Sequence, residues 1–260
     1  MISSQPVVFV SDADSDSGKA VFLRFAREGA RLVLNSRSSG AAIGAELEAA
    51  REQGADVCVV DGDLSDGAEV ERVLRLAERE SGPIGVFVHN PDLLIPAAVE
   101  TCAEEIFLDV MNANAKSAFL CVQAVGKRMA AREAGAIVLV TSVHAEKPTG
   151  SSFAYSASKG AVKMLAKEAA VFLGRFGITV NTVEPGAMEG DGSRFRSSVS
   201  ALYEDYEYKV PNAVPGAWEE LAHVVSFLAS DRARFVNGTD IRLDGGFLLH
   251  YMDHKMKRPK

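Results

Sequence analysis

Short apolar runs rich in β-branched residues alternate with longer amphipathic segments along almost the whole chain. The apolar runs predict strands at Val7–Val10, Arg31–Leu34, Val57–Val60, Gly85–His89, Ala136–Thr141, Thr179–Val183 and Asp240–Leu243. The amphipathic segments predict helices near Lys19–Glu28, Ala41–Gln53, Ala68–Glu80, Ala103–Arg132, Ala154–Arg175 and Glu219–Ala229. This alternation is typical of βαβ units. It predicts an α/β fold in which a doubly wound, Rossmann-type parallel sheet of about seven strands carries helices on both faces.

Two glycines, Gly29 and Gly54, follow the last periodic residues of two helical segments, where helices commonly end. No internal repeat or interdomain linker divides the chain, so residues 1–260 are expected to form one domain. The segment 187–215 is long and rich in Gly, Pro and aromatic residues, which favours a substrate lid or binding loop with Tyr203 as a candidate substrate contact. An ordinary helical excursion that packs the same aromatic side chains is the alternative.

The composition fits one folded domain, with 260 residues of which 47% are hydrophobic and 24% charged. A net charge of −7 argues against a nucleic-acid partner. No stretch reaches the roughly 18 apolar residues of a membrane helix and the start lacks a charged signal region, so a cytoplasmic protein without a membrane partner is expected. Cys58, Cys102 and Cys121 lack metal-like spacing, so free thiols and no metal site are expected.

The candidate chemistry lies in Tyr155 and Lys159, with Ser142 upstream. A phenol has a pKa of about 10 and needs help to exchange a proton at neutral pH. Positions four apart share a helix face, so the Lys159 ammonium can lie near the Tyr155 ring and favour the phenolate. A serine hydroxyl can hydrogen-bond the same substrate oxygen. These residues predict a site that moves a proton on and off a C–O group.

These motifs form part of an ordered set that covers nearly the whole chain. The set comprises Asn114 five residues before Phe119, Thr141-Ser142-Val143, Tyr155-Ser156-Ala157-Ser158-Lys159, Pro185-Gly186, Phe227-Leu228-Ala229-Ser230-Asp231 and Leu243-Asp244-Gly245-Gly246. In this order the chain resembles the short-chain dehydrogenase/reductase family. Asn112 is a second candidate for the family's helix asparagine, in poorer register.

The resemblance implies catalytic roles for four residues. Tyr155 would be the general acid/base, and Ser142 would orient the substrate carbonyl. Lys159 would lower the pKa of Tyr155 and hold the nicotinamide ribose, and Asn114 would hold a water that links Lys159 to solvent. The resemblance also implies a small-molecule substrate and a homodimer or homotetramer.

The expected glycine-rich phosphate loop departs from the family pattern, because Asp12 and Asp16 replace its first two glycines and Gly18 alone remains. A carboxylate about 4 Å from a phosphate charge, at an effective dielectric near 20, is repelled by about 4 kcal/mol. Binding would weaken roughly a thousandfold. Side chains turned to solvent, a bound cation, or aspartates that cap the following helix are the arrangements left open.

The other cofactor positions are implied by the resemblance. They are Ser11, Ser17, Gly18, Asp63, Leu64, Asn90, Pro185 and Gly186, together with Tyr155 and Lys159. Arg37 follows the second strand, where no acidic residue is present to bind an NAD ribose, and this favours NADP over NAD. His89, Pro91 and Asp92 depart from the family pattern. His144 is a candidate substrate contact, with a surface histidine as the alternative.

The leading interpretation is an NADP(H)-dependent oxidoreductase that interconverts a carbonyl and an alcohol on a small organic substrate. If Asp12 and Asp16 exclude the nucleotide, the alternative is a non-redox lyase, dehydratase or isomerase on the same scaffold. A cofactor-less subunit of a hetero-oligomer is a third hypothesis. The intact set of Asn114, Ser142, Tyr155 and Lys159 argues against the last two.

Overall fold

The computed structural model describes residues 5–191, 210–211 and 214–249. The predicted lid at 187–215 therefore falls mostly outside the described residues, and Tyr203 falls wholly outside them.

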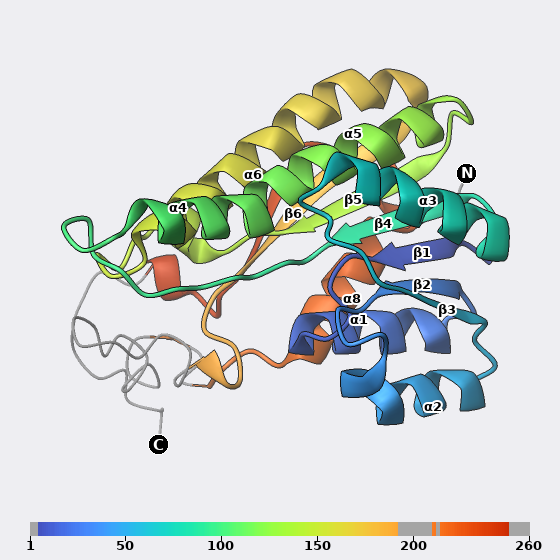
Figure 1. Cartoon of the computed structure of the whole chain (residues 1–260), viewed down its shortest axis with the longest axis horizontal. Helices are drawn as coiled ribbons and strands as arrows, with labels where there is room; N and C mark the ends of the chain where they lie inside the picture. The colour runs from blue at the N-terminus through green and yellow to red at the C-terminus, as the bar shows by residue number, and fades with distance from the viewer. Residues whose placement is uncertain (1–4, 192–209, 212–213, 250–260) are drawn as a thin grey trace.

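A parallel sheet of seven strands forms the centre of the protein, in the order β3-β2-β1-β4-β5-β6-β7 (Figure 1). The strands are β1 (Val7–Val10), β2 (Arg31–Asn35), β3 (Val57–Val60), β4 (Ile84–His89), β5 (Gly135–Val140), β6 (Ile178–Pro185) and β7 (Asp240–Leu243). The predicted strands are confirmed to within two residues at each end. The doubly wound α/β fold is confirmed as well.

Helices cover both faces of this sheet (Figure 1). On one face lie α1 (Asp16–Arg27), α2 (Gly44–Glu52) and α8 (Trp218–Leu228), and on the other lie α3 (Gly67–Ser81), α4 (Glu104–Met111), α5 (Ser117–Ala130) and α6 (Phe153–Leu173). Short turns of 3-10 helix are η1 (Ala41–Ile43), η3 (Val143–Ala145), η4 (Gly174–Phe176), η6 (Asp231–Ala233) and η7 (Phe247–Leu249). No described helix is both long enough and apolar enough to cross a membrane.

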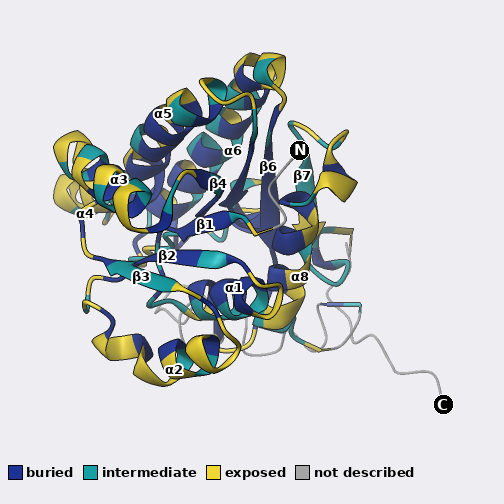
Figure 2. Ribbon diagram, turned by 90° about the vertical axis from the view of Figure 1, so that its right-hand side faces the viewer, coloured by how far each residue is buried: buried dark blue, intermediate teal, exposed yellow. Residues whose placement is uncertain are grey.

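Alternate residues of each strand supply two separate hydrophobic cores. Val8 and Val10 of β1 pack into the core beneath α1, α2 and α8, whereas Val7 and Phe9 pack into the core beneath α3, α5 and α6. The central strands β1 and β4 are largely apolar because both of their faces are buried, as in other parallel sheets (Figure 2).

The predicted helix Ala103–Arg132 is wrong in one respect, because a π-helical turn, η2 (Asn112–Lys116), separates α4 from α5. Such a turn inserts an extra residue into the helix and is frequent at functional sites. It carries Asn114, which is fully buried. Hydrophobic periodicity continues through the turn, so the sequence pattern alone could not reveal it.

Gly18 lies where α1 packs closely on the loop that follows β1. A Cβ atom at this position would lie 1.9 Å from the Asp12 carbonyl oxygen, which is backbone and cannot move without distorting the loop. The Gly18 position therefore requires glycine for packing, whatever the loop binds.

We predict that Gly18→Ala destabilises the fold by on the order of 1–3 kcal/mol, because the added methyl group overpacks the loop. Chemical denaturation with circular dichroism detection measures the change. Gly160→Ala is the matched control, since an added Cβ there meets nothing within 4 Å inside α6. It should stabilise the protein by up to about 1 kcal/mol. Equal stability of the two variants would contradict this account of the loop.

Candidate active site

The candidate site lies where the strand order reverses, between β1 and β4, at the carboxyl ends of the strands. In open α/β sheets this position is where ligands bind. The loop after β1 brings Ser11 there, the segment after β4 brings Asn90 and Asp92, and the end of β5 leads to Ser142.

Tyr155 and Lys159 lie one turn apart on α6, and both are almost fully buried. The Lys159 Nζ atom lies 5.5 Å from the centroid of the Tyr155 ring. The ammonium also donates to the carbonyl oxygens of Pro91 at 2.9 Å and Val140 at 3.3 Å. The predicted pairing of the phenol with the ammonium is therefore present.

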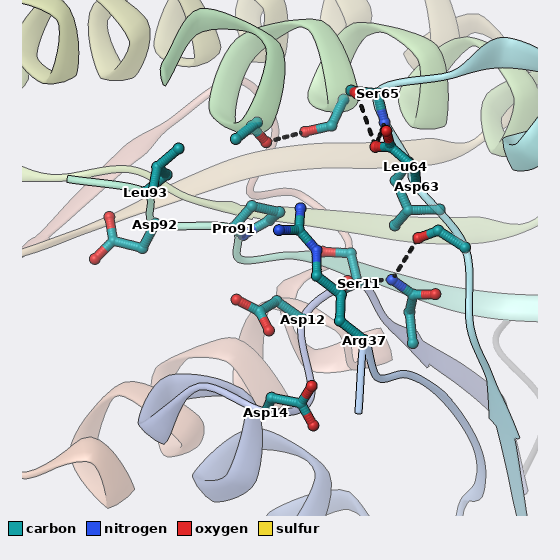
Figure 3. Close-up of a pocket in the computed structure, with 14 residues that line it drawn as sticks. Ser11, Asp12, Asp14, Arg37, Asp63, Leu64, Ser65, Pro91, Asp92 and Leu93 are labelled. Atoms are coloured by element: carbon teal, nitrogen blue, oxygen red, sulfur yellow. Dashed lines mark hydrogen bonds between the residues drawn. The ribbon is translucent and has the colours of Figure 1, made fainter. Parts of the chain in front are cut away.

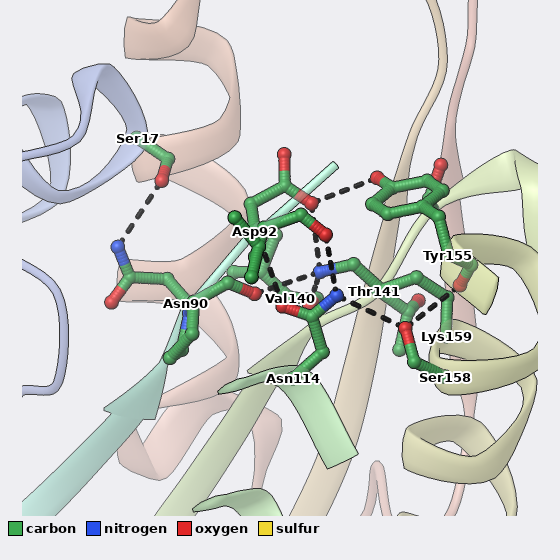
Figure 4. A network of polar contacts seen from close by, with 12 residues as sticks. Ser17, Asn90, Asp92, Asn114, Val140, Thr141, Tyr155, Ser158 and Lys159 are labelled. Carbon is green, nitrogen blue, oxygen red and sulfur yellow. Dashed lines mark hydrogen bonds and ion pairs between the residues drawn. The ribbon is translucent and has the colours of Figure 1, made fainter. Parts of the chain in front are cut away.

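Asp92 completes this pair in a way that the sequence interpretation did not foresee. One carboxylate oxygen, Asp92 Oδ1, accepts a hydrogen bond from Tyr155 Oη at 2.8 Å and lies 2.9 Å from Lys159 Nζ (Figure 4). A carboxylate that accepts from a phenol and an ammonium makes charge-assisted hydrogen bonds, which are about twice as strong as neutral ones. Asp92 thus occupies the point at which both donors converge.

Ser142 follows β5 and is buried beside the start of η3. Its Oγ atom accepts from the backbone N–H of His144 at 3.2 Å, and its own hydroxyl proton can be directed to another acceptor. Ser142 therefore caps a short helical turn, and this contact is compatible with the predicted catalytic role.

His144 is buried against Tyr155, with the two ring centroids 6.1 Å apart in an edge-on arrangement. Its Nδ1 atom lies 3.0 Å from the Lys147 carbonyl oxygen, which can only accept, so Nδ1 carries the proton. Burial lowers the pKa of His144 from its ordinary value. The surface position considered for His144 is wrong, and its place beside Tyr155 keeps it a candidate substrate contact.

Asn114 fixes the segment that carries Asp92. Its side-chain amide accepts from the Leu93 backbone N–H and donates to the Leu93 carbonyl oxygen, both at 2.9 Å. It also donates to Ser158 Oγ at 3.0 Å (Figure 4). Asn114 thereby ties the chain after β4 to α6, next to the tyrosine and lysine.

Asn90 holds the modified phosphate loop closed. Its Nδ2 atom donates to Asp12 O, Ser15 Oγ and Ser17 Oγ at 2.7–3.1 Å, and its Oδ1 atom accepts from the Asp12 backbone N–H at 3.0 Å. Ser11 Oγ lies 3.3 Å from the same Oδ1. The predicted residues Ser11, Ser17 and Asn90 are therefore brought together, but their polar atoms bond to one another.

Ser15 is the N-cap of α1, and its side chain accepts from the Gly18 N–H. The expectation that Asp12 or Asp16 could cap this helix is therefore wrong. Asp16 lies in the first helical turn and is exposed. The serine takes the capping position because its short hydroxyl reaches the free N–H directly.

A cleft of about 250 Å³ runs from this loop to Pro91 and Asp92, the segment whose Asp92 side chain contacts the tyrosine and lysine. It is lined by four carboxylates and one guanidinium, which are Asp12, Asp14, Asp63, Asp92 and Arg37. In the view of Figure 3, Asp12 lies between Asp14 and Asp92, and Arg37 extends past it. The charged groups of this cleft are therefore predominantly negative.

The surroundings of the cleft change the pKa of Asp12 and supply hydrogen bonds to Asp14. Burial and the neighbouring Asp14 carboxylate raise the pKa of Asp12, and Arg37 offsets part of this effect. The Asp14 carboxylate accepts from the hydroxyls of Ser36 and Ser38 at 2.7 and 3.1 Å. A negative group of this chain thus already lies at the end of β2, beside Arg37.

The remaining predicted cofactor positions also lie at this edge of the sheet. Asp63 accepts from the backbone and hydroxyl of Ser65, and these bonds lower the pKa of Asp63. Leu64 is buried and lines the cleft beside Asp63. At the end of β6, the Gly186 N–H donates to Leu243 O, so Pro185 and Gly186 are held against the exit of β7.

Comparison with known proteins identifies the class. A family described as Enoyl-(Acyl carrier protein) reductase matches residues 14–248. The chain is 30% identical to glucose 1-dehydrogenase of Gluconobacter oxydans, over 94% of this chain and 92% of that one. It is 28% identical to 3-oxoacyl-[acyl-carrier-protein] reductase FabG of Staphylococcus epidermidis, over 92% and 98% of the two chains.

Solved structures agree with these relatives. Levodione reductase superposes with a TM-score of 0.88 at 29% identity, over 96% of this chain and 100% of that one. NAD⁺-bound xylitol dehydrogenase superposes with a TM-score of 0.85 at 26% identity, over 93% and 98% of the two chains. The chain therefore belongs to the short-chain dehydrogenase/reductase family, whose members are carbonyl/alcohol oxidoreductases that use nicotinamide cofactors.

The residues of this cleft do not fit a nicotinamide dinucleotide as they stand. Asp92 already bonds Tyr155 and Lys159, the two groups expected to face the nicotinamide half. Asp12 and Asp14 place carboxylates along the part of the cleft where a pyrophosphate would lie. Phosphates and carboxylates repel one another, and partial burial strengthens the repulsion.

Sequence reasoning noted Asp92 as a departure from the family pattern but gave it no role. An acidic residue directly after a buried strand was the available signal, since the carboxyl ends of parallel strands face the site. The contact with Tyr155 depends on how the chain turns after β4, which residue spacing does not specify.

We predict that Asp12→Asn raises the melting temperature at pH 7. Because folding raises the pKa of Asp12, its ionised form destabilises the folded state as the pH rises above the ordinary pKa of 3.8. The gain should shrink as the pH falls through the raised pKa of the folded state toward that value, because the carboxyl of the folded protein then becomes protonated. Thermal melts between pH 4 and 8 measure it. Asp16→Asn, at an exposed position, is the control, and an equal gain there would contradict the assignment.

Proposed function

We propose that this chain transfers a proton to and from the oxygen of a small carbonyl or alcohol compound, with Tyr155 as general acid/base. The observation that carries the proposal is the convergence of Tyr155 Oη and Lys159 Nζ on one oxygen atom, at 2.8 and 2.9 Å. In the structure that atom belongs to Asp92, and it stands in for the oxygen of a bound substrate. A phenol within hydrogen-bond reach of the reacting oxygen is positioned for acid–base catalysis.

The other residues assist this proton transfer. Lys159 places a positive charge beside the reacting oxygen, which stabilises negative charge as it develops there. Ser142 supplies a second hydroxyl donor for the same oxygen. Asn114 acts as a positioning residue, because it fixes the Leu93 backbone and Ser158 on either side of the pair.

Interconversion of a carbonyl and an alcohol is the function favoured by the family. NADP(H) is the hydride carrier that Arg37 favours, although Asp14 opposes a 2′-phosphate at the same strand end. The substrate proposed is a small organic molecule, since the similar proteins include a glucose 1-dehydrogenase and a levodione reductase.

The poor fit of the cleft to a nicotinamide dinucleotide also favours a second function. The contacts of Asp92 and the half-buried carboxylate of Asp12 in the phosphate loop support a non-redox lyase, dehydratase or isomerase, in which Tyr155 and Ser142 transfer protons without a nucleotide. Exchange of the proton next to a ketone carbonyl in D₂O, followed by NMR without nucleotide, would favour this function. Turnover that requires NADPH or NADH would favour oxidoreduction. Activity that requires an added homologous subunit would favour the partner-subunit hypothesis.

Self-association into a homodimer or homotetramer is also proposed. The outer surfaces of α5 and α6 expose large apolar side chains, among them Phe119, Met164, Val171 and Phe172. Val171 is 78% exposed, although valine is one of the residue types most often buried in folded proteins. A second copy of the chain would cover this surface.

We predict that Tyr155→Phe lowers kcat by at least about 100-fold on any compound that the wild type turns over, because the proton donor is lost. Ser142→Ala should lower kcat by roughly 100-fold, as expected for loss of one donor to the reacting oxygen. Steady-state rates measure both changes. Unchanged catalysis by Tyr155→Phe would contradict the proposed function.

The matched control for the serine is Ser156→Ala. Ser156 lies beside Tyr155 on the same helix, but its Oγ atom has no hydrogen-bond partner among the described residues. Its variant should retain wild-type kcat and a wild-type melting temperature.

A further inference from the structure

Asp92 is held in place from both sides, so its contact with Tyr155 and Lys159 is built into the fold. On one side, Lys159 Nζ also donates to the carbonyl oxygen of the preceding residue, Pro91, at 2.9 Å. On the other side, Asn114 bonds both backbone groups of the following residue, Leu93. The carboxylate thus extends from a short segment that is fixed at each end.

The contact also satisfies a buried charge. Lys159 is 1% exposed and Asp92 is 22% exposed by side chain, so the ammonium depends on partners within the protein. Removing one member of a buried ion pair is costly, because the other charge is left without compensation. A ligand oxygen that takes the place of Asp92 must therefore replace a charged partner of Lys159.

We propose that Asp92 is an internal competitor for the ligand-binding positions of Tyr155 and Lys159, and that it selects against nicotinamide dinucleotides. This inference rests on the proposed function, because it assumes that the two residues bind the reacting molecule. A neutral ribose hydroxyl is a weaker partner for an ammonium than a carboxylate is. Binding of the dinucleotide would also place its phosphates beside the Asp12 and Asp14 carboxylates, whereas the contact made by Asp92 involves no phosphate.

The selection depends on charge as well as on space. A neutral substrate that displaces Asp92 leaves Lys159 without its carboxylate partner. An anionic dinucleotide does the same, and it is also repelled by the other carboxylates of the cleft. Salt screens such repulsion. Nucleotide affinity of the wild type should therefore not fall with added salt, in contrast to the usual behaviour of phosphate-binding sites.

Titration of NADPH and NADH into the full chain tests the proposal without any substrate. Trp218, the single tryptophan, borders the pocket formed by Asp12, Asp16 and Asp92, so its fluorescence reports binding. Isothermal titration calorimetry gives an independent dissociation constant. We expect Asp92→Gly and Asp92→Asn to bind the better of the two nucleotides at least ten-fold more tightly than the wild type.

A control variant and a second test variant accompany this titration. Asp109→Asn removes the same charge from an exposed position on α4 and should bind nucleotide as the wild type does. Asp92→Asn keeps the side-chain volume and an acceptor oxygen for Lys159, so it carries the test if Asp92→Gly does not fold. The melting temperature of each variant shows which of them is folded.

The proposal is overturned if the folded Asp92 variants bind nucleotide no more tightly than the wild type does, or if the Asp109→Asn control gains as much affinity as they do. Either result would leave the proton-transfer role of Tyr155 intact, because that role is tested by turnover of Tyr155→Phe. Conversely, a ten-fold gain in affinity stands even if Tyr155→Phe remains active. Failure of the inference and failure of the proposed function are thus distinguishable.

Discussion

The structure depends on the hydrogen-bond and charge partners of one buried ammonium, that of Lys159. Lys159 lies within the protein, and burying an unpaired charge is strongly unfavourable. Its partners are the carbonyl oxygens of Pro91 and Val140 and the carboxylate of Asp92, so it joins the ends of β4 and β5 to α6. Because Tyr155 is one turn away on the same helix, the interaction that satisfies the charge also assembles the site.

In the modified phosphate loop after β1, too, polar groups are bonded to other groups of the protein. A family member that binds phosphates through a glycine-rich turn leaves backbone N–H groups available there. Here Asn90 bonds both backbone groups of Asp12, Ser15 accepts from the Gly18 N–H, and Asp14 bonds the serines at the end of β2. The loop has become a self-bonded structure with a negative surface, while Gly18 is retained for packing. Tyr155 and Lys159 remain near a cleft whose charge opposes the family's cofactor.

Most of the fold could be predicted from the sequence, because the central parallel strands are buried on both faces and largely apolar, and the helices are amphipathic. The pairing of Tyr155 with Lys159 could be predicted too, since helical spacing fixes it. The π-turn at Asn112–Lys116 could not, because its hydrophobic pattern resembles that of a continuous helix. The contact of Asp92 with Tyr155 joins residues 63 positions apart, and no local pattern encodes such a contact.

The most direct test of the central claim is a high-resolution crystal structure of the unliganded protein. The account predicts electron density for the Asp92 carboxylate within hydrogen-bond distance of both Tyr155 Oη and Lys159 Nζ. A carboxylate turned to solvent, with ordered water between the phenol and the ammonium, would contradict it.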